Sequence, residues 1–444
     1  MSTILDLAQQ AVEIAKSQGV SEVEAYSSQV AELEVEVSDG QVENLQKAEE
    51  TGLSLRILKN GRLGFAYTND LSRQGLERAV QEAIEITQVV PEDRFYSFPD
   101  PIDYEPLDLL DREYSRVPVE EKIELAKEIE AAARAYDSRV RKVRMAQYSE
   151  RFYEVAIANS HGLAIFYQVT GFSGSTMAVA EADGVSETGW GFDFAHRLKE
   201  LDPKRIGEEA ARRSVEMLGA KRVASQKADI VLDPVVGAEF LGVIAPALTG
   251  EAVQKGKSLF YDKVGQEVAS KVVNIVDDGR QVQGAAAAPV DDEGVPTGRT
   301  QLVAEGKLQG FLHSIYTAGK AGVEPTGNGL RSSYRGRPES SPSNIYLVPG
   351  DKGGEQIISE VQKGLYVTSV MGMHTANPIS GDFSLGASGL WIENGEIAYP
   401  VRGVAIAGNI VSFLKSVVEV GSDLRFTGSY GAPTVRVSGI SISG

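Results

Sequence analysis

The sequence predicts an α+β fold, with an N-terminal domain of helices on an antiparallel sheet and a β-rich C-terminal domain built as a barrel or a sandwich. In the first half of the chain, segments with helical spacing alternate with segments that have the two-residue period of strands. In the second half, short apolar segments are separated by glycine turns, and helical spacing is sparse. The pattern changes near residues 220–228, so we expect domains at residues 1–222 and 223–444.

Four segments of the N-terminal domain have apolar residues at helical spacing. They are residues 4–18, 72–88, 118–136 and 202–219. Pro118 and the pair Asp202-Pro203 suit a helix start, where proline is tolerated and an aspartate accepts free backbone N–H groups. Residues 91–116 carry prolines among acidic residues, which predicts a surface loop or a linker.

The predicted strands of this domain follow from alternation and from turn residues. Glutamate alternates with leucine or valine over residues 32–37, which is typical of a half-buried strand with a charged outer face. Further strands are expected at residues 53–57 and 63–67, and residues 139–200 have the pattern of a strand meander. The turn signals between the strands are Asp39-Gly40, Asn60-Gly61, His161-Gly162 and Asp183-Gly184.

The C-terminal domain is predicted to begin with a strand at residues 230–232. Its sparse helical segments are residues 233–250, 354–364 and 408–418. Asn394-Gly395 is a strong signal for a type I′ hairpin between two apolar segments. That hairpin is a feature of the fold and carries no chemistry.

Composition limits the function classes. The net charge is −18 and the pI is near 4.9, so phosphate backbones repel the chain and no direct nucleic-acid binding is expected. The chain has no cysteine, which excludes disulfides, thiolate zinc sites and cysteine nucleophiles. Residues 1–6 lack the pattern of a secretory signal, and no segment has the ~18 apolar residues of a membrane span. We therefore expect a cytoplasmic protein with no membrane partner.

The histidines do not form a helical zinc motif. A helical zinc peptidase site needs two histidines about one turn apart and a nearby glutamate base. None of the four histidines lies within five residues of another. A site made from distant residues, such as His313, His374 and carboxylates, stays open as an alternative. We favour a simpler interpretation, with His313 in a strand and His374 in a structured loop.

Three adjacent acids, Asp291, Asp292 and Glu293, form the next candidate site. They could bind Ca²⁺ or Mg²⁺, act in acid–base catalysis, or lie in a solvated loop. Consecutive carboxylates point apart in an extended chain, so we favour the solvated loop. Residues 324–331, which include Asn328 and Arg331, could bind an anion through backbone amides. They fit no phosphate-binding motif, and we expect loop architecture there.

The loop at residues 372–384 is rich in turn residues. His374 and Asp382 could pair with each other, and Asn377 precedes a proline in a turn signal. Ser384 is close in sequence, but a serine hydrolase of the common type needs a Gly-x-Ser-x-Gly elbow, which the chain lacks. We expect this loop to shape a cavity wall or a subunit contact.

Two C-terminal segments resemble a known family. Residues 373–384 read Met-His-Thr-Ala-Asn-Pro-Ile-Ser-Gly-Asp-Phe-Ser, and residues 390–401 read Leu-Trp-Ile-Glu-Asn-Gly-Glu-Ile-Ala-Tyr-Pro-Val. Together they resemble the C-terminal signature of the TldD/TldE (PmbA) family of peptidase subunits. The acidic block at 291–293 and the Pro-Thr-Gly-Asn element near residue 326 also have counterparts in that family.

The resemblance also places the zinc motif of the family. TldD-type chains carry His-Glu-x-x-x-His on a helix, followed by a Lys-Gly-x-Ser element, which is similar to residues 255–258 here. Counting back puts Leu241 and Pro246 at the ligand positions and Gly242 at the glutamate position. None of these side chains can bind zinc or move a proton. The chain is therefore similar to the TldE/PmbA branch, which shares the fold without the metal site.

By this resemblance we expect a metal-free, TldE/PmbA-like subunit of a cytosolic peptidase that processes unfolded or leader peptides. The chain itself would hold no cofactor, with zinc in a TldD-like partner, or it would pair with itself. A link to DNA gyrase in the family would be indirect, through peptide processing. Two alternatives are an autonomous hydrolase with a non-standard metal site and a non-enzymatic peptide-binding scaffold. The candidate lining residues for a peptide or chamber are Asp291, Asp292, Glu293, His313, Asn328, Arg331, His374, Asn377 and Asp382.

Overall fold

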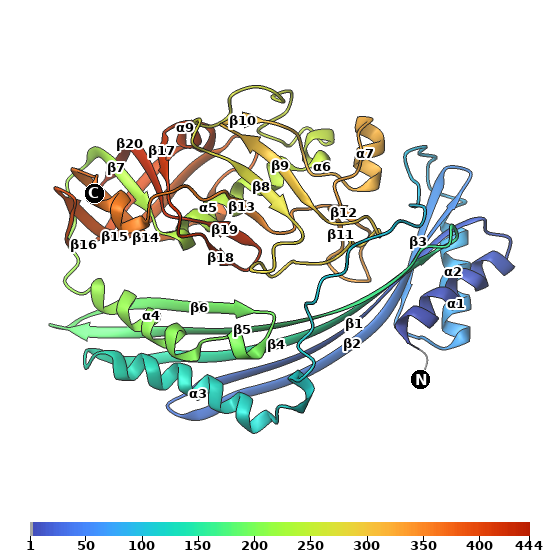
Figure 1. Ribbon diagram of the computed structural model, residues 1–444, viewed down its shortest axis with the longest axis horizontal. Helices are drawn as coiled ribbons and strands as arrows, with labels where there is room; N and C mark the ends of the chain where they lie inside the picture. The colour runs from blue at the N-terminus through green and yellow to red at the C-terminus, as the bar shows by residue number, and fades with distance from the viewer. Residues whose placement is uncertain (1–2) are drawn as a thin grey trace.

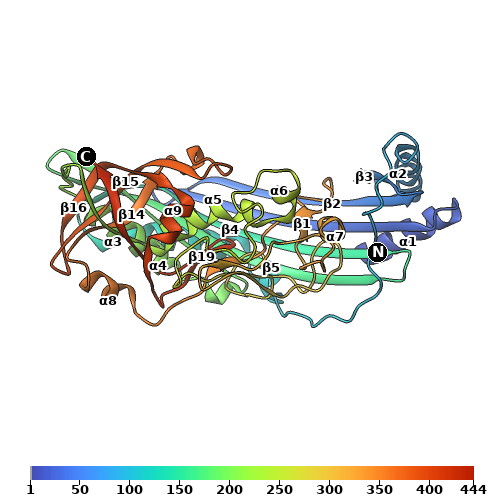
Figure 2. The ribbon, with the colours of Figure 1, turned by 90° about the horizontal axis from the view of Figure 1, so that it is seen from above.

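The computed structural model describes residues 3–444, and its N-terminal half is built on a six-stranded antiparallel sheet in the order β3-β2-β1-β4-β5-β6. The strands are β1 (Glu22–Ser38), β2 (Gln41–Lys59), β3 (Arg62–Thr68), β4 (Val140–Asn159), β5 (Ala164–Ala182) and β6 (Val185–Ala195). Met1 and Ser2, where the segment examined for a secretory signal begins, lie outside the described residues. The sheet is long and curved, and the C-terminal half of the chain lies against one face of it (Figures 1 and 2).

Helices cover the other face of the sheet, as the helical spacing predicts. They are α1 (Ile4–Ser17), α2 (Arg73–Ile86), α3 (Val119–Tyr136) and α4 (Pro203–Glu216). Helices α1 and α2 pack at one end of the sheet, and α3 and α4 pack near the other end (Figure 1). Leu33, Val35 and Val37 of β1 are buried in the same apolar cluster as residues of α3 and α4. The alternation at residues 32–37 is thus confirmed, since its apolar members face the helices.

Four of the five predicted turns have the backbone of type I′ turns, whereas at His161-Gly162 only the glycine has positive φ. In Asp39-Gly40, Asn60-Gly61, Asp183-Gly184 and Asn394-Gly395 both residues have positive φ. Asparagine and aspartate tolerate this region better than other side chains, and glycine adopts it freely. Short local sequence therefore determines how each pair of strands is connected.

The C-terminal half contains a closed five-stranded barrel, one of the two architectures that the sequence predicted. Its strands are β7 (Gln226–Leu232), β14 (Lys363–Met371), β15 (Asp382–Glu393), β16 (Glu396–Asn409) and β20 (Val435–Ser443). They run in the order β16-β15-β14-β7-β20, and pairing of β16 with β20 closes the ring. Strand β17 (Val417–Val420) extends the sheet at β20.

A second sheet and several short elements complete this half. The sheet has the order β10-β9-β8-β13-β19-β18. Its strands are β8 (Ile275–Asp278), β9 (Arg299–Ala304), β10 (Lys307–Leu308), β13 (Ile345–Leu347), β18 (Arg425–Thr427) and β19 (Tyr430–Ala432). The short pair β11 (Gly329–Leu330) and β12 (Glu339–Ser340) and the helix α7 (Ile315–Ala321) lie beside it.

The predicted C-terminal helices are shorter than expected. The segment 233–250 divides into α5 (Pro234–Ile244), a 3₁₀ turn at Ala245–Leu248 and α6 (Gly250–Gln254). Pro246 explains the break, because proline removes a backbone donor and crowds the preceding turn. Helices α8 (Gly354–Ser359) and α9 (Ile410–Lys415) likewise cover only parts of the predicted segments, since tertiary pairing places Lys363–Met371 and Val417–Val420 in strands.

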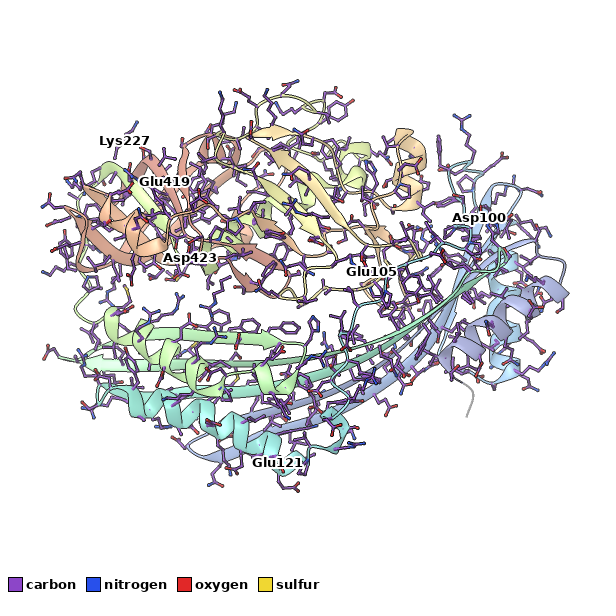
Figure 3. All side chains as sticks on the ribbon, in the orientation of Figure 1. Asp100, Glu105, Glu121, Lys227, Glu419 and Asp423 are labelled. Carbon is purple, nitrogen blue, oxygen red and sulfur yellow. The ribbon has the colours of Figure 1, made fainter. Side chains whose placement is uncertain are left out.

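The proline-rich segment at residues 91–116 is a strap between the two halves. Leu109 is buried, and its carbonyl oxygen accepts a hydrogen bond from the backbone N–H of Thr170 in β5. Arg280 of the C-terminal half donates to the carbonyl oxygen of Glu105, which Figure 3 labels on the strap. No helix among residues 3–444 has the length and apolar character needed to cross a bilayer.

A buried ion cluster, which we call the first clamp, joins the N-terminal sheet to the C-terminal half. Arg56 of β2 donates to Glu24 of β1 at 2.9 and 2.5 Å and to Glu293 of the C-terminal half at 2.7 Å. Arg331, also from the C-terminal half, reaches the same Glu24 at 2.6 Å. The four side chains are 6% exposed or less. Each buried charge therefore has an oppositely charged partner across the domain interface.

A second clamp lies at α4 and at the N-terminus of α5. Arg213 of α4 contacts Asp233 at 3.0 Å, and Asp233 also caps α5 by accepting from the backbone N–H of Val235. Arg425 of β18 pairs with Glu209 of α4 at 2.5 Å. The two clamps are formed by different elements of the sheet and the helices, so they fix the spacing of the two halves at two places.

Replacing Arg56 by leucine should destabilise the protein strongly. The change leaves Glu24 and Glu293 buried near each other without their shared cation, and breaking a buried ion pair from one side costs about 3–5 kcal/mol. Denaturant unfolding followed by circular dichroism measures the loss. Arg78→Leu, which removes an exposed pair with Asp70, is the matched control and should leave the unfolding free energy almost unchanged. Equal midpoints for the two variants would contradict the role of the clamp.

Candidate functional site

A cleft lies between the domains, on the sheet face opposite the helices, which we call the inner face. Its volume is about 410 Å³, and most of its lining comes from β1, β4, β5 and β6. Ala285 and Gly428 of the C-terminal half line the opposite side. A second hollow of about 370 Å³ adjoins it, sharing Glu32, Arg151 and Tyr153, and extends the cleft toward Arg331.

Strand pairing arranges the cleft residues in rows across the inner face. Glu34 of β1 is paired with Ser149 of β4, Ser149 with Ser173 of β5, and Ser173 with Phe194 of β6. Directly paired residues point to the same face of a sheet. This row therefore runs from a carboxylate, over two serine hydroxyls, to an aromatic ring. The next row, Glu36-Gln147-Ser175-Phe192, has the same ends but a glutamine in its floor.

The acidic side of the cleft is only partly neutralised. Glu32 pairs with Arg151 at 2.5 Å, and the Arg151 guanidinium also lies over the ring of Tyr153. Among residues 3–444, Glu34 and Glu36 form no ion pair. Both are half-buried on the inner face. The charged outer face predicted for residues 32–37 is thus the wall of an interdomain cleft.

The aromatic side of the cleft is formed by alternate residues of β6. The rings of Trp190 and Phe192 are stacked, with centroids 5.5 Å apart and planes 7° from parallel. Their glycine neighbours face α4, where a Cβ at Gly191 would lie 2.1 Å from the carbonyl oxygen of Ile206. Close packing against α4 thus requires glycine on one face of β6, and the aromatic residues occupy the other face.

The ring of Phe194 is supported from both sides. A Cβ at Gly171 would lie 3.0 Å from the Phe194 ring, so the absence of a side chain there leaves room for it. The imidazole of His196 packs edge-on at 5.1 Å, and its Nδ1 lies 2.7 Å from the carbonyl oxygen of Thr170. These contacts fix the ring on the cleft wall.

The edge of β2 on the side of β3 has no strand neighbour over much of its length. Strand β3 pairs with β2 only over Leu53–Lys59, and within the described residues no strand covers residues 41–52 on that side. Residues 41–50 are exposed. Such an edge presents unpaired backbone N–H and C=O groups to an incoming extended chain.

The acidic block at 291–293 is buried, so the expectation of a solvated loop is wrong. Asp291 is fully buried and accepts backbone N–H groups of Glu293, Val295 and Gly329 at 2.8–2.9 Å. Burial raises the pKa of Asp291, and the charge of Glu293 adds to this rise. A tight turn with Gly294 at positive φ brings these groups together, which the extended-chain argument did not foresee.

The neighbouring acids bind across the interface. Asp292 accepts from the backbone N–H of Arg331 at 2.7 Å, and burial raises the Asp292 pKa although the Arg331 charge opposes the rise. Glu293 belongs to the first clamp and also accepts from the backbone N–H of Ile315 at 2.8 Å. The candidate residues Asp291, Asp292, Glu293 and Arg331 are thus gathered in one interdomain network.

His313 lies in the loop before α7 and is not in a strand, in contrast to the expectation. Its Nδ1 is 3.2 Å from the Thr317 hydroxyl, and burial lowers the His313 pKa. Asn328 is buried nearby: its side-chain oxygen accepts from Thr326, and its amide donates to Asp277 at 2.7 Å. Both residues stabilise loop structure through internal hydrogen bonds.

Asp277 is a buried acid that the sequence analysis did not single out. It accepts from Asn328 and, at 2.6–2.8 Å, from the backbone N–H and hydroxyl of Ser343. Burial raises its pKa to about 6, although these hydrogen bonds favour the charged form. Asp277 lies in a short strand whose ordinary composition gives no signal of this environment.

The residues of the 372–384 loop lie apart from both the cleft and the acidic network. His374 is exposed on a short 3₁₀ turn at Met373–Thr375. Asp382 accepts from Ser380 and Asn409, which lowers its pKa, and no hydrogen bond joins it to His374 within the described chain. The Asn377 side chain accepts backbone N–H groups of its own turn. Of the nine candidate lining residues, only Arg331 lines the cleft or its extension.

The positions that the family resemblance assigns to the zinc motif carry no nitrogen, oxygen or sulfur donor in their side chains. Leu241 is 1% exposed in the apolar core, Gly242 faces open space, and Pro246 is exposed at the end of α5. Their side chains offer no nitrogen, oxygen or sulfur donor, so this helix does not fit a zinc ion. Over residues 3–444, no group of three or more His, Cys, Asp or Glu side chains is placed to hold a metal.

Comparison with protein families gives three matches along the chain. Residues 225–444 match the C-terminal domain of PmbA/TldA metallopeptidases. Residues 112–218 match the central domain of these proteins, and residues 23–87 match their first domain.

Individual relatives agree with these matches. The metalloprotease PmbA of Escherichia coli O157:H7 is 29% identical over 100% of this chain and 95% of its own length. A metalloprotease of Methanothermobacter thermautotrophicus is 31% identical over 88% and 85% of the two chains. A Thermotoga maritima structure named in relation to a modulator of a DNA gyrase has a TM-score of 0.92 and 31% identity over 99% and 100% of the two chains. The structure of TldE from Thermococcus kodakarensis has the same fold, with a TM-score of 0.90 and 23% identity over 99% and 100% of the two chains.

The buried acid Asp277 predicts a specific pH dependence. Its pKa is raised from 3.8 to about 6 on folding, so its contribution to stability is complete below pH ~4 and is lost as the pH rises through ~6. The difference in unfolding free energy between the wild type and Asp277→Asn should fall by up to about 3 kcal/mol between pH 4 and pH 7. Asp183→Asn in an exposed turn is the control and should show no such change. A pH-independent difference for Asp277→Asn would refute the assignment.

Proposed function

Because the chain belongs to the PmbA/TldA metallopeptidase family, we propose that it is the metal-free, TldE/PmbA-like subunit of a cytosolic peptidase of the TldD/TldE type. In this assembly a TldD-like chain supplies the zinc site, and this chain binds and orients an extended peptide. The substrates are unfolded polypeptides and leader segments. Membranes and nucleic acids are not partners of this subunit.

The proposal rests on the absence of metal-ligating side chains at three positions in and just after α5. Leu241, Gly242 and Pro246 stand at the positions where the zinc-binding branch has histidines and a glutamate, and none of them can hold a metal or transfer a proton. A hydrolytic step therefore needs residues from another chain. No catalytic step is assigned to this protomer.

Two surfaces support a role in holding extended peptides. The interdomain cleft has room for an extended segment, and the small side chains of Ser149, Gly171 and Ser173 in its floor leave the middle of the sheet accessible. The uncovered edge of β2 can add a peptide as a further strand, with main-chain hydrogen bonds that tolerate many sequences. A folded protein cannot offer its backbone in this way, so both surfaces favour unfolded chains.

Mixing this protein with a TldD-like zinc chain tests the proposal. We expect the two chains to co-purify, to contain about one zinc per pair, and to cleave an unfolded peptide. The isolated protein should hold no stoichiometric zinc and should leave the same peptide intact. Size-exclusion chromatography, metal analysis and mass spectrometry of the products provide the measurements.

Three results would contradict the proposed role in different ways. Stoichiometric zinc in the isolated protomer, together with peptide cleavage by it, would identify an autonomous hydrolase. A stable pair that binds peptide without cleaving it would identify a scaffold. A dimer of this protein that forms in the absence of the zinc chain would indicate self-association in place of a heteromeric enzyme.

A further inference from the structure

The two walls of the cleft have the same repeat. Glu32, Glu34 and Glu36 lie at alternate positions of β1, and Trp190, Phe192 and Phe194 lie at alternate positions of β6. Glu36 and Trp190 extend these two series beyond the residues that line the cleft itself. Alternate residues on a strand are about 6.6–6.8 Å apart. An extended peptide has this same spacing between alternate side chains, so it can stay in register with both walls over several residues.

The distance between the walls suits one extended chain. Glu34 and Phe194 occupy one row and are separated by the two strands β4 and β5. Three strand spacings amount to about 14 Å. A peptide lying along the trough over Ser149 and Ser173 directs successive side chains alternately toward the glutamate wall and the aromatic wall.

Charge and ring chemistry define what each wall accepts. Glu34 and Glu36 form no ion pair within residues 3–444, and Arg151, the one cation among the residues lining the cleft, is paired with Glu32. The roof contributes Ala285 and Gly428, which carry no charge. The glutamate wall therefore attracts a basic side chain, and the aromatic wall accepts an apolar one.

We infer that the cleft selects extended peptide segments in which basic and apolar side chains alternate. The inference rests on the proposed peptide-binding function and specifies its substrate class. The basic residues pair with Glu34 and Glu36, and the apolar residues pack on Phe192 and Phe194. The net charge of −18 adds a long-range attraction for such segments.

Binding of three labelled octapeptides to the full chain tests this inference. The first alternates lysine and leucine, the second has the same composition with the lysines in one block and the leucines in another, and the third alternates glutamate and leucine. Fluorescence anisotropy should give the tightest binding for the lysine–leucine alternation, weaker binding for the block peptide and none for the acidic peptide. Added salt should weaken binding of the alternating peptide.

An internal reporter localises the binding. The protein has two tryptophans; Trp391 is 1% exposed, whereas Trp190 is half-exposed on the aromatic wall. An unlabelled alternating peptide should change the Trp190 emission, and Trp190→Phe should abolish the change.

Matched variants distinguish an effect of the cleft walls on peptide affinity from an effect of the net charge of the protein. Glu34→Gln combined with Glu36→Gln should weaken the alternating peptide about five- to tenfold. Glu120→Gln combined with Glu121→Gln changes the charge equally on α3, which lies on the far side of the sheet where Figure 3 labels Glu121, and should have almost no effect. Phe194→Ala should reduce the preference for the alternating over the block peptide.

The outcomes distinguish this inference from the proposed function. Equal affinity for the alternating and block peptides, or an equal loss in both pairs of glutamate variants, overturns the inference and leaves general peptide binding intact. Failure of the isolated chain to bind any of the three peptides overturns it as well. Cleavage by the mixed pair of chains tests the proposed function separately, because it needs no sequence preference in this cleft.

Discussion

The buried contact of Arg56 with Glu24 and Glu293 is the constraint on which the cleft depends. It joins β1 and β2 of the N-terminal sheet to a loop of the C-terminal half, and Arg331 of that half donates to the same Glu24. The second clamp fixes α4 to the start of α5 and to β18. With both clamps formed, the inner face is held against the C-terminal half while the sheet between them remains free to line a cleft.

Buried charges are a costly way to join two domains, and this explains where they occur. Desolvation opposes each ion, so an apolar interface of similar volume would give equal or greater stability. An apolar interface, however, would fill the space between the domains, whereas a few directional contacts fix the spacing and leave room beside them. Arg425 illustrates this arrangement, because it pairs with Glu209 and also donates to the backbone of Phe192 on the cleft wall at 2.8 Å. The aromatic wall is thus positioned by the same cluster that holds the domains.

Local patterns allowed the sequence to predict most of the fold, but not the environment of individual charges. The I′ turns, the amphipathic helices and the alternation at residues 32–37 depend on neighbours in sequence, and they were confirmed. The burial of Asp291 and Glu293 depends on contacts with Gly329 and Arg56, which are distant in sequence, and the expectation for them was wrong. The cleft is the most instructive case. Its acidic wall was recognised as the polar face of a strand, but only the C-terminal half, packed opposite, makes that face part of a site.

The same reasoning explains why the cleft and helix α5 are structurally independent. Helix α5 is anchored at its start, where Asp233 accepts from Arg213 and from the hydroxyl of Tyr366 at 2.8 Å. Leu241 then contributes to the apolar core of the C-terminal half. The helix therefore has a structural role that needs no metal ligand. The cleft, in turn, is formed by β1, β4, β5 and β6 together with loops outside α5. Because the cleft lining contains no residue of α5, the side chains on this helix can differ without altering the walls of the cleft.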